Sequence, residues 1–148
     1  MMRFRPIPEG LRVLADGSWR VGDQPVRHAA SLRYLKAHLS LDGGPAIVDG
    51  EKRVPITLEG PPFEVLRLVV SAKRGECHAV LDDGSRELLA DGALGMSSAT
   101  GRFECLVRGG RATAFLSRGA HQTLLDAVVE VDGSFFLQAG PRRIRIRT

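Results

Sequence analysis

The stretch Asp16-Gly17-Ser18-Trp19 returns near the other end of the sequence as Asp132-Gly133-Ser134-Phe135, and this repeat is the strongest indication of how the chain is organised. Both copies run on to a second Gly, a Pro and an Arg. Asp-Gly next to alternating apolar residues is a strong signal for a β-hairpin. Two interpretations stay open: a duplicated unit whose copies are joined out of phase, or the chance recurrence of a common turn sequence.

An amphipathic helix is predicted beside each hairpin. The first helix is expected over residues 29–39, where leucines recur at helical spacing: Leu32, Leu35 and Leu39. The second is expected over about 117–130, with Ser117 as its N-cap and Leu124 on its buried side. The first hairpin precedes its helix, whereas the second hairpin follows its helix.

Between the helices the hydrophobic period changes from 3.6 to 2, which predicts strands. Residues 54–58 alternate. Because Pro55 has no amide to donate, this strand is expected to lie at a sheet edge or to have its proline pointing outward. Residues 64–70 are apolar at nearly every position, which is typical of a central strand covered on both faces. Asp82-Asp83-Gly84 predicts a hairpin turn, and the small residues of 91–102 predict a loop.

These elements predict an α+β fold of two small, mutually packed halves, each an antiparallel sheet with one helix. The first half is expected to cover residues 1–60 as a hairpin, a helix and a strand. The second is expected to cover 61–148 and to be rich in strands. With 148 residues, the chain has room for one domain or for two very small ones that share a core.

The charge of the chain is concentrated at one end. The net charge of +4 is accounted for by four arginines among the last eight residues: Arg142, Arg143, Arg145 and Arg147. No apolar run approaches the roughly 20 residues that a membrane span needs. The N-terminal residues do not resemble a signal peptide, so a cytoplasmic protein is expected. Cys77 and Cys105 are too few for a disulfide scaffold.

No catalytic or metal site is predicted, and no cofactor is expected. The four histidines show no ligand spacing, and Cys77 and His78 point to opposite faces of a strand. Asp82 and Asp83 are interpreted as solvated turn residues, and both cysteines as buried structural thiols. The small-residue loop around 95–98 lacks the motifs of hydrolases and phosphate-binding loops, and it is a plain connection or a ligand flap.

Binding is the more promising activity. Arg27 lies just before the first predicted helix and Arg118 just inside the second. A helix N-terminus carries partial positive charge, so a cation there is unfavourable unless an anion or a neighbouring carboxylate compensates it. Both explanations remain open: a bound anion at each helix start, or pairing with a nearby acidic residue.

The chain is predicted to close with a hairpin in which residues 134–137 and 143–147 pair across a turn at Gly140-Pro141. A cationic stripe is predicted on the last strand of this hairpin. Arg143, Arg145 and Arg147 alternate with Ile144 and Ile146, which places three guanidinium groups on one face about 7 Å apart. Such a stripe could contact nucleic-acid phosphates or an acidic protein, or could protect an edge strand from self-pairing. Nucleic acid is the less supported partner, because the chain has few aromatic residues for base stacking.

Several short sequence motifs, taken together, resemble those of a bacterial family of unknown function, DUF1285. In the first half these are the DGSW stretch with Gly22, 25–27, 50–52, 56–59 and 62–63. In the second half they are 107–109, Ala114 and Arg118. The chain departs from the family pattern at Gly60, where Asp is usual, and at 121–122, where aromatic residues are usual. It is also shorter than typical members.

The resemblance implies a duplicated α+β core whose second half is similar to pleckstrin-homology domains. It also implies a site between the halves for a nucleotide-like or nucleic-acid-based ligand, and a role in signalling. We therefore expect a non-catalytic module that binds an anionic, nucleotide-like ligand. The residues expected to form that site are Trp19, Arg27, Lys52, Arg108 and Arg118.

Trp19 could stack on a base or fill the core. The alternative function is a protein-interaction adaptor, in which the arginine stripe meets an acidic partner. A third interpretation is a hydrolase with an unrecognised site.

Overall fold

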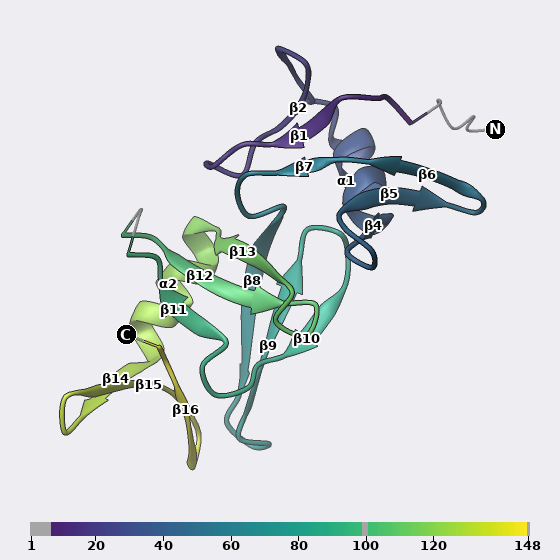
Figure 1. Ribbon diagram of the computed structural model, residues 1–148. Coiled ribbons are helices and arrows are strands. Elements are labelled where there is room, and N and C mark those ends of the chain that lie inside the picture. Colours follow the sequence, from purple (N-terminus) through teal and green to yellow (C-terminus); the bar gives the residue numbers. More distant parts are fainter. Residues whose placement is uncertain (1–6, 99–100, 148) are drawn as a thin grey trace. The chain divides into compact units, whose positions relative to one another are not determined.

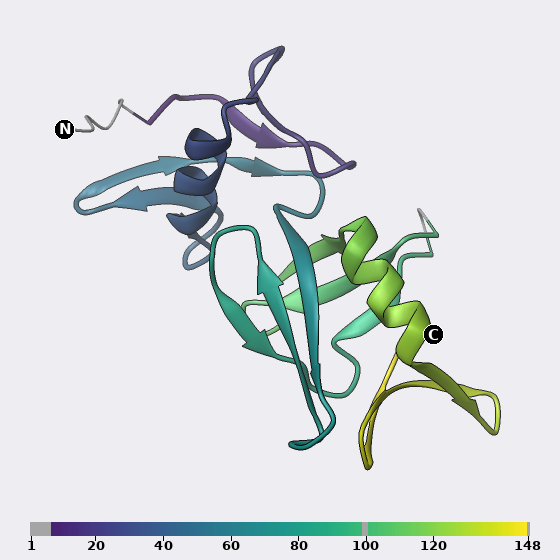
Figure 2. The ribbon, with the colours of Figure 1, turned by 180° about the vertical axis from the view of Figure 1, so that it is seen from behind.

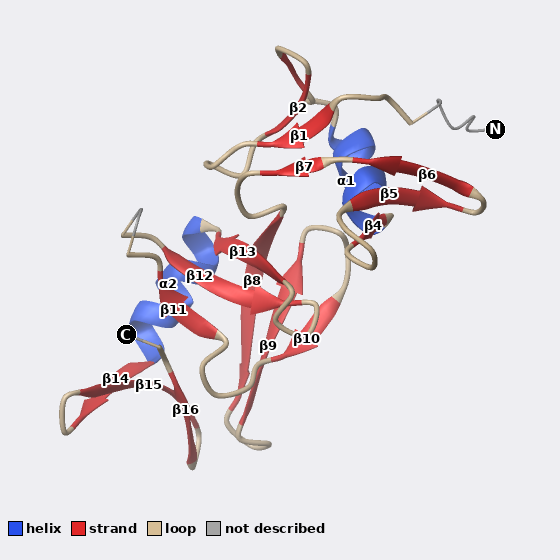
Figure 3. Cartoon of the chain, in the orientation of Figure 1, coloured by secondary structure: helices blue, strands red, loops and turns tan. Residues whose placement is uncertain are grey.

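The computed structural model describes residues 7–98 and 101–147. It is an α+β structure with two helices and several small sheets (Figure 1). The chain divides into two compact units, Met1–Pro62 and Phe63–Thr148. Each unit contains one helix and is otherwise built from strands and turns (Figure 3). The predicted α+β class is therefore confirmed.

The first unit contains helix α1 (Ala29–Ala37) and two sheets, with strand orders β3-β2-β1-β7 and β4-β5-β6. The strands are β1 (Leu11–Val13), β2 (Trp19–Val21), β3 (Gln24–Pro25), β4 (Leu39–Ser40), β5 (Ala46–Asp49), β6 (Lys52–Pro55) and β7 (Thr57–Leu58). Strands β1 and β7 are parallel. The prediction of a purely antiparallel sheet was wrong, because the chain passes through α1 and the second sheet before it returns beside β1.

Helix α1 ends two residues before the predicted limit. Leu39 pairs with Ile47 in the β4–β5 ladder, so it contributes to a sheet and not to the last helical turn. Leu35 is the buried residue of the helix. Pro55 is exposed on β6, an edge strand, as its missing amide predicted.

The second unit is built on a six-stranded sheet with the order β10-β9-β8-β13-β12-β11. The strands are β8 (Phe63–Ser71), β9 (Glu76–Leu81), β10 (Arg86–Leu88), β11 (Leu94–Met96), β12 (Phe103–Val107) and β13 (Ala112–Leu116). This sheet is also mixed, because β8 and β13 are parallel. Strand β11 lies inside the segment predicted as a loop. The expected similarity to pleckstrin-homology domains is not confirmed.

Helix α2 (Arg118–Ala127) packs against β8 and β13, as Figure 2 shows from behind. Strand β8 is central, but a bulge at Leu66 interrupts its register with β9, and Leu66 and Arg67 are exposed. The prediction of a strand covered on both faces was therefore wrong at this point. Ser117 satisfies the backbone of the bulge: its amide donates to the Val65 carbonyl (2.9 Å) and its hydroxyl to the Leu66 carbonyl (2.8 Å).

A three-stranded sheet follows α2 without a loop. Its strands are β14 (Val128–Val131), β15 (Ser134–Ala139) and β16 (Arg142–Arg145), in that order. The helix was predicted to reach residue 130, but β-branched Val128 and Val129 favour a strand instead. The predicted hairpin of β15 and β16 is confirmed.

The repeated Asp-Gly-Ser sequence forms two different turns. At Asp132-Gly133 both residues have positive φ (51° and 82°) in a two-residue hairpin turn. Asp16-Gly17-Ser18 instead has the geometry of Asp83-Gly84-Ser85. This third copy of the Asp-Gly-Ser sequence was not identified in the sequence analysis. In both, the aspartate Oδ1 accepts from the serine amide and hydroxyl, at 2.6–2.9 Å.

The backbone bonds of these two turns also correspond. The Leu14 amide donates to Ser18 as the Leu81 amide donates to Ser85, both at 2.9 Å. The closest local correspondence is therefore between residues 13–18 and 80–85, one hairpin turn in each unit.

Gly60 has no room for a side chain. A Cβ atom there would lie 2.3 Å from the Leu14 carbonyl oxygen and 2.7 Å from the Ala15 Cα, both backbone atoms of the same unit. We predict that Gly60→Ala destabilises the first unit by about 1–3 kcal/mol, the usual cost of overpacking. Trp19, the single tryptophan, reports the unfolding of this unit by its fluorescence in urea.

Gly119→Ala in helix α2 is the control, and its unfolding is followed by circular dichroism because α2 lies in the second unit. A Cβ atom there would meet only the Ser117 hydroxyl, at 3.9 Å, and alanine favours the helix by up to about 1 kcal/mol. An unchanged midpoint for Gly60→Ala would contradict the steric argument.

Candidate functional site

The five predicted ligand residues are divided between the units: Trp19, Arg27 and Lys52 lie in the first, and Arg108 and Arg118 in the second. Trp19 is 2% exposed, and its indole N–H donates to the Pro62 carbonyl at 3.0 Å. The indole is therefore part of the core of the first unit. In this position its ring has no free face for a base.

Three of the four predicted cations are exposed to solvent. Arg27 precedes His28, the N-cap of α1, Lys52 begins β6, and Arg118 is the first residue of α2 behind the N-cap Ser117. All three are exposed. Neither helix has an acidic residue in its first turn, so no carboxylate there offsets the helix dipole.

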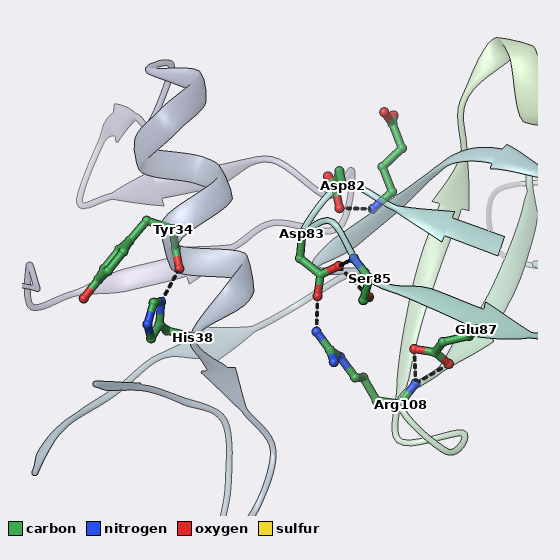
Figure 4. Close-up of polar contacts among 8 residues, drawn as sticks. Tyr34, His38, Asp82, Asp83, Ser85, Glu87 and Arg108 are labelled. Carbon is green, nitrogen blue, oxygen red and sulfur yellow. Dashed lines mark hydrogen bonds and ion pairs between the residues drawn. The ribbon is translucent and has the colours of Figure 1, made fainter. Parts of the chain in front are cut away.

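Arg108 has several partners within the second unit. Its guanidinium forms an ion pair with Asp83, and its backbone amide donates to both Glu87 carboxylate oxygens, at 3.0 and 3.1 Å (Figure 4). The guanidinium also lies over the Phe63 ring, 4.9 Å from its centre. Only 3% of the Asp83 side chain is exposed, against 31% for Arg108. Arg108 therefore serves an internal contact, and its charge is already compensated.

These contacts require the six-stranded sheet to curl. Glu87 lies on β10 and Arg108 follows β12, and these strands are four positions apart in the sheet. In a flat sheet they would be about 19 Å apart at the usual strand spacing. A glutamate side chain cannot span that distance, so the sheet must bend to bring the β12–β13 turn to β10.

The position of Arg108 has a conformational cost. Its φ is +54°, in the left-handed region that non-glycine residues seldom occupy, and its Nε atom is buried without a hydrogen-bond partner. Such strain is retained where surrounding contacts overdetermine it. The bonds from Asp83 and Glu87 are those contacts.

A second polar cluster lies in the first unit. The Tyr34 hydroxyl donates to Asp49. His38 Nδ1 lies 2.9 Å from the Tyr34 carbonyl oxygen (Figure 4). The hydrogen bond to Asp49, together with burial, raises the pKa of Tyr34 to about 12. A phenol that holds its proton this firmly is a hydrogen-bond donor and a weak acid, and it is not ionised at neutral pH.

The two cysteines are buried, as predicted, and burial raises their pKa values to about 11 for Cys77 and about 12 for Cys105. At neutral pH both remain thiols, which are weak nucleophiles.

Within residues 7–98 and 101–147, no three His, Cys, Asp or Glu side chains converge as metal ligands. In the same part of the chain, neither helix has the length and hydrophobicity to cross a membrane.

The predicted arginine stripe is only partly present. Arg143 and Arg145 are exposed on β16, whereas Arg147 is half-buried. The Arg147 guanidinium donates to the backbone carbonyls of Gly92 and Ala93 and lies against Gly95. Arg147 therefore anchors the chain end to β11 and leaves two arginines facing solvent.

Strand β16 is also less open at its edge than the sequence indicated. The Arg145 amide donates to Asp91 Oδ1 and its carbonyl accepts from the Gly92 amide, both at 2.9 Å. The Arg147 amide donates to the Leu94 carbonyl at 2.8 Å. Backbone partners thus protect this end of the strand, in addition to the charge that was predicted to do so.

The two exposed arginines share a sheet face with apolar residues. The register places Val129, Phe136 and Arg145 in one row across the three strands, and Gln138 and Arg143 in another. Val131 lies on the same face of β14. Sequence reasoning missed this combination, although the alternation within residues 134–138 was visible, because the partners of each strand were unknown. We name Val129, Val131, Phe136, Arg143 and Arg145 the outer face of the C-terminal sheet.

The value of the Arg108 ion pair can be isolated with two matched variants. Asp83→Ala should cost about 2–4 kcal/mol, because it leaves the Arg108 guanidinium without its counter-charge. Asp16→Ala removes the same two serine contacts in an exposed turn, where Arg20 adds only a weaker electrostatic attraction than the serine bonds, and should cost about 1 kcal/mol. Urea unfolding followed by circular dichroism measures both. Equal losses would show that the ion pair contributes nothing.

Tyr34 is the only tyrosine, so its titration can be followed by phenolate absorbance. We predict ionisation near pH 12 in the folded protein, and nearer pH 10 in Asp49→Asn. Because the folded-state pKa is the higher one, the stabilisation from this pair is complete below about pH 10 and is lost as the pH rises toward 12. Trp19 fluorescence checks that the protein stays folded. Identical titrations of both proteins would contradict this assignment.

Comparison with known proteins supports the fold. No family model matches the chain, and no curated protein sequence matches it. The crystal structure of a DUF1285 family protein from Silicibacter pomeroyi DSS-3 aligns with a TM-score of 0.71 and 21% identity, over 93% of this chain and 80% of that one. A DUF1285 protein from Shewanella baltica OS155 aligns with a TM-score of 0.59 and 12% identity, over 80% and 91%. The resemblance noted in the sequence is thus confirmed in the fold, which this chain shares with the DUF1285 proteins.

Proposed function

We propose that this chain is a non-catalytic binding module that holds an anionic partner on the outer face of its C-terminal sheet. The observation that carries the proposal is the exposure of Arg143 and Arg145 on a face to which the three strands contribute no carboxylate. The Asp91 carboxylate beside Arg145 accepts from the backbone amide of that residue. Neither guanidinium forms an ion pair with another described residue. The Arg143 Nε atom donates to the neutral Gln138 amide oxygen at 3.2 Å, so its charge remains uncompensated.

The nucleotide-like ligand is the second candidate. Arg27 and Arg118 favour it, because each is an exposed cation at the start of a helix whose first turn has no acid. The internal contacts of Trp19 and Arg108 weigh against the full five-residue site. The proposal also includes a signalling role and a cytoplasmic location, and each of these accords with either candidate partner.

Two double variants distinguish these candidates. Arg143→Glu with Arg145→Glu and Arg27→Glu with Arg118→Glu change the net charge equally. We predict that the first pair abolishes salt-dependent retention on a heparin or sulfonate resin, whereas the second pair lowers it only slightly. Removing phosphate or sulfate contacts reduces both affinity and its salt dependence.

If the Arg27 and Arg118 variant lost its retention and the Arg143 and Arg145 variant kept most of it, the anion would bind at the N-termini of the helices. A thermal-shift series with nucleotides would then be expected to stabilise the wild type, because a ligand that binds the folded state raises its melting temperature. If both double variants lost retention equally, retention would depend only on the net charge of the protein. That result would contradict a localised binding surface.

A further inference from the structure

We infer that the partner held by the outer face is an amphipathic helix of another protein, with an apolar stripe and acidic side chains along one flank. This inference rests on the proposed function and assigns the class of partner. The face has two parts. Val129, Val131 and Phe136 on β14 and β15 form an apolar part, and Arg143 and Arg145 on β16 form a cationic part.

The outer face is less buried than the opposite face of the same sheet, and its apolar residues Val129, Val131 and Phe136 are half-buried. None of its residues is fully buried, whereas Leu137, Ala139 and Ile144 on the opposite face of the same sheet are at most 1% exposed. A sheet needs one buried face for stability, and the opposite face supplies it. The exposed part of the apolar side chains on the outer face is therefore available for a partner.

Strand addition is a poor mode of binding beside the arginines. The outward backbone groups of Arg145 are already bonded to Asp91 and Gly92, so a peptide cannot pair with β16 there. A strand laid flat on the face would leave its own amides and carbonyls unpaired as the contact excluded water. A helix satisfies its backbone internally and needs only side-chain contacts, as in other helix-binding grooves and surfaces.

Charge and spacing fit an acidic flank. Arg143 and Arg145 are two residues apart on one strand, which separates their Cα atoms by about 7 Å. Carboxylates four residues apart on a helix are separated by about 6 Å at Cβ. Two such carboxylates can meet the two guanidinium groups while the adjacent apolar stripe covers Phe136 and Val129. Arginine forms strong, often bidentate bonds with carboxylates.

Single-stranded nucleic acid fits less well. It would use the same two arginines for phosphates, but base stacking needs exposed aromatic rings. The outer face has a single aromatic residue, Phe136, and it is half-buried. The valines beside Phe136 can make apolar contacts with a helix, but they have no aromatic ring on which a base could stack.

The test uses the full chain and labelled synthetic helical peptides in fluorescence anisotropy. One peptide has leucines on one face and glutamates at i and i+4 on the adjacent flank. A second has glutamine in place of glutamate, and a third has the glutamates moved to the far side. Polyglutamate and a single-stranded oligonucleotide are the other anionic probes. We expect the first peptide to bind best, and binding to weaken as salt rises.

Phe136→Ala should weaken binding of that peptide by about tenfold or more, as expected for an interface aromatic, and leave polyglutamate binding unchanged. Phe135→Ala is the matched control, because Phe135 is 38% exposed on the opposite face of the same strand. It should leave both unchanged. Circular dichroism checks folding, and Val131→Ser provides the same test at the end of β14 if Phe136→Ala does not fold.

The outcomes separate the inference from the proposed function. Polyglutamate binding that needs Arg143 and Arg145, combined with peptide binding that ignores Phe136, would overturn the helix partner and leave the anion surface in place. Tighter binding of the oligonucleotide through the same residues would overturn it in favour of nucleic acid. Failure of every anionic probe would overturn both.

Discussion

The contact between Arg108 and two acidic residues joins parts of the second unit that are distant in its sheet. Asp83 and Glu87 belong to the β9–β10 hairpin, and Arg108 to the turn after β12. Their contact keeps the six-stranded sheet curled, and a curled sheet can enclose buried residues such as Cys77 and Cys105. The left-handed backbone of Arg108 and its unpaired Nε are costs of this arrangement. A residue expected to bind ligand is thus part of the scaffold.

The C-terminal sheet depends on the same unit through Ser117 and α2. Ser117 caps the helix by accepting from the Ala120 amide at 3.1 Å and also satisfies the bulge of β8. The helix continues directly into β14, and Arg147 ties the far end of the chain to the carbonyls of Gly92 and Ala93. With both ends fixed, the sheet can bury one face and leave the other to solvent. Exposure of Arg143 and Arg145 is a consequence of this anchoring.

Local signals in the sequence predicted much of the secondary structure. The leucine spacing located α1, Ser117 located the start of α2, and Gly140-Pro141 located the last turn. The parallel pairs β1–β7 and β8–β13 could not be predicted, because they join segments far apart in the sequence. The same holds for β11, a three-residue strand that exists because β12 and Arg147 lie beside it. The α2 boundary was missed by three residues where β-branched residues begin.

The sequence by itself determined the class of fold, the turns and the location of excess charge, because these depend on residue type and on neighbours a few positions away. Only the tertiary structure decided what each charged or aromatic residue does. Trp19 and Phe135 each follow an Asp-Gly-Ser sequence, yet Trp19 is 2% exposed and Phe135 is 38% exposed. Arg143 and Arg145 face solvent, whereas Arg108 and Arg147 are held by carboxylates or carbonyls. Burial and pairing depend on which distant segments meet, and a local pattern does not specify that.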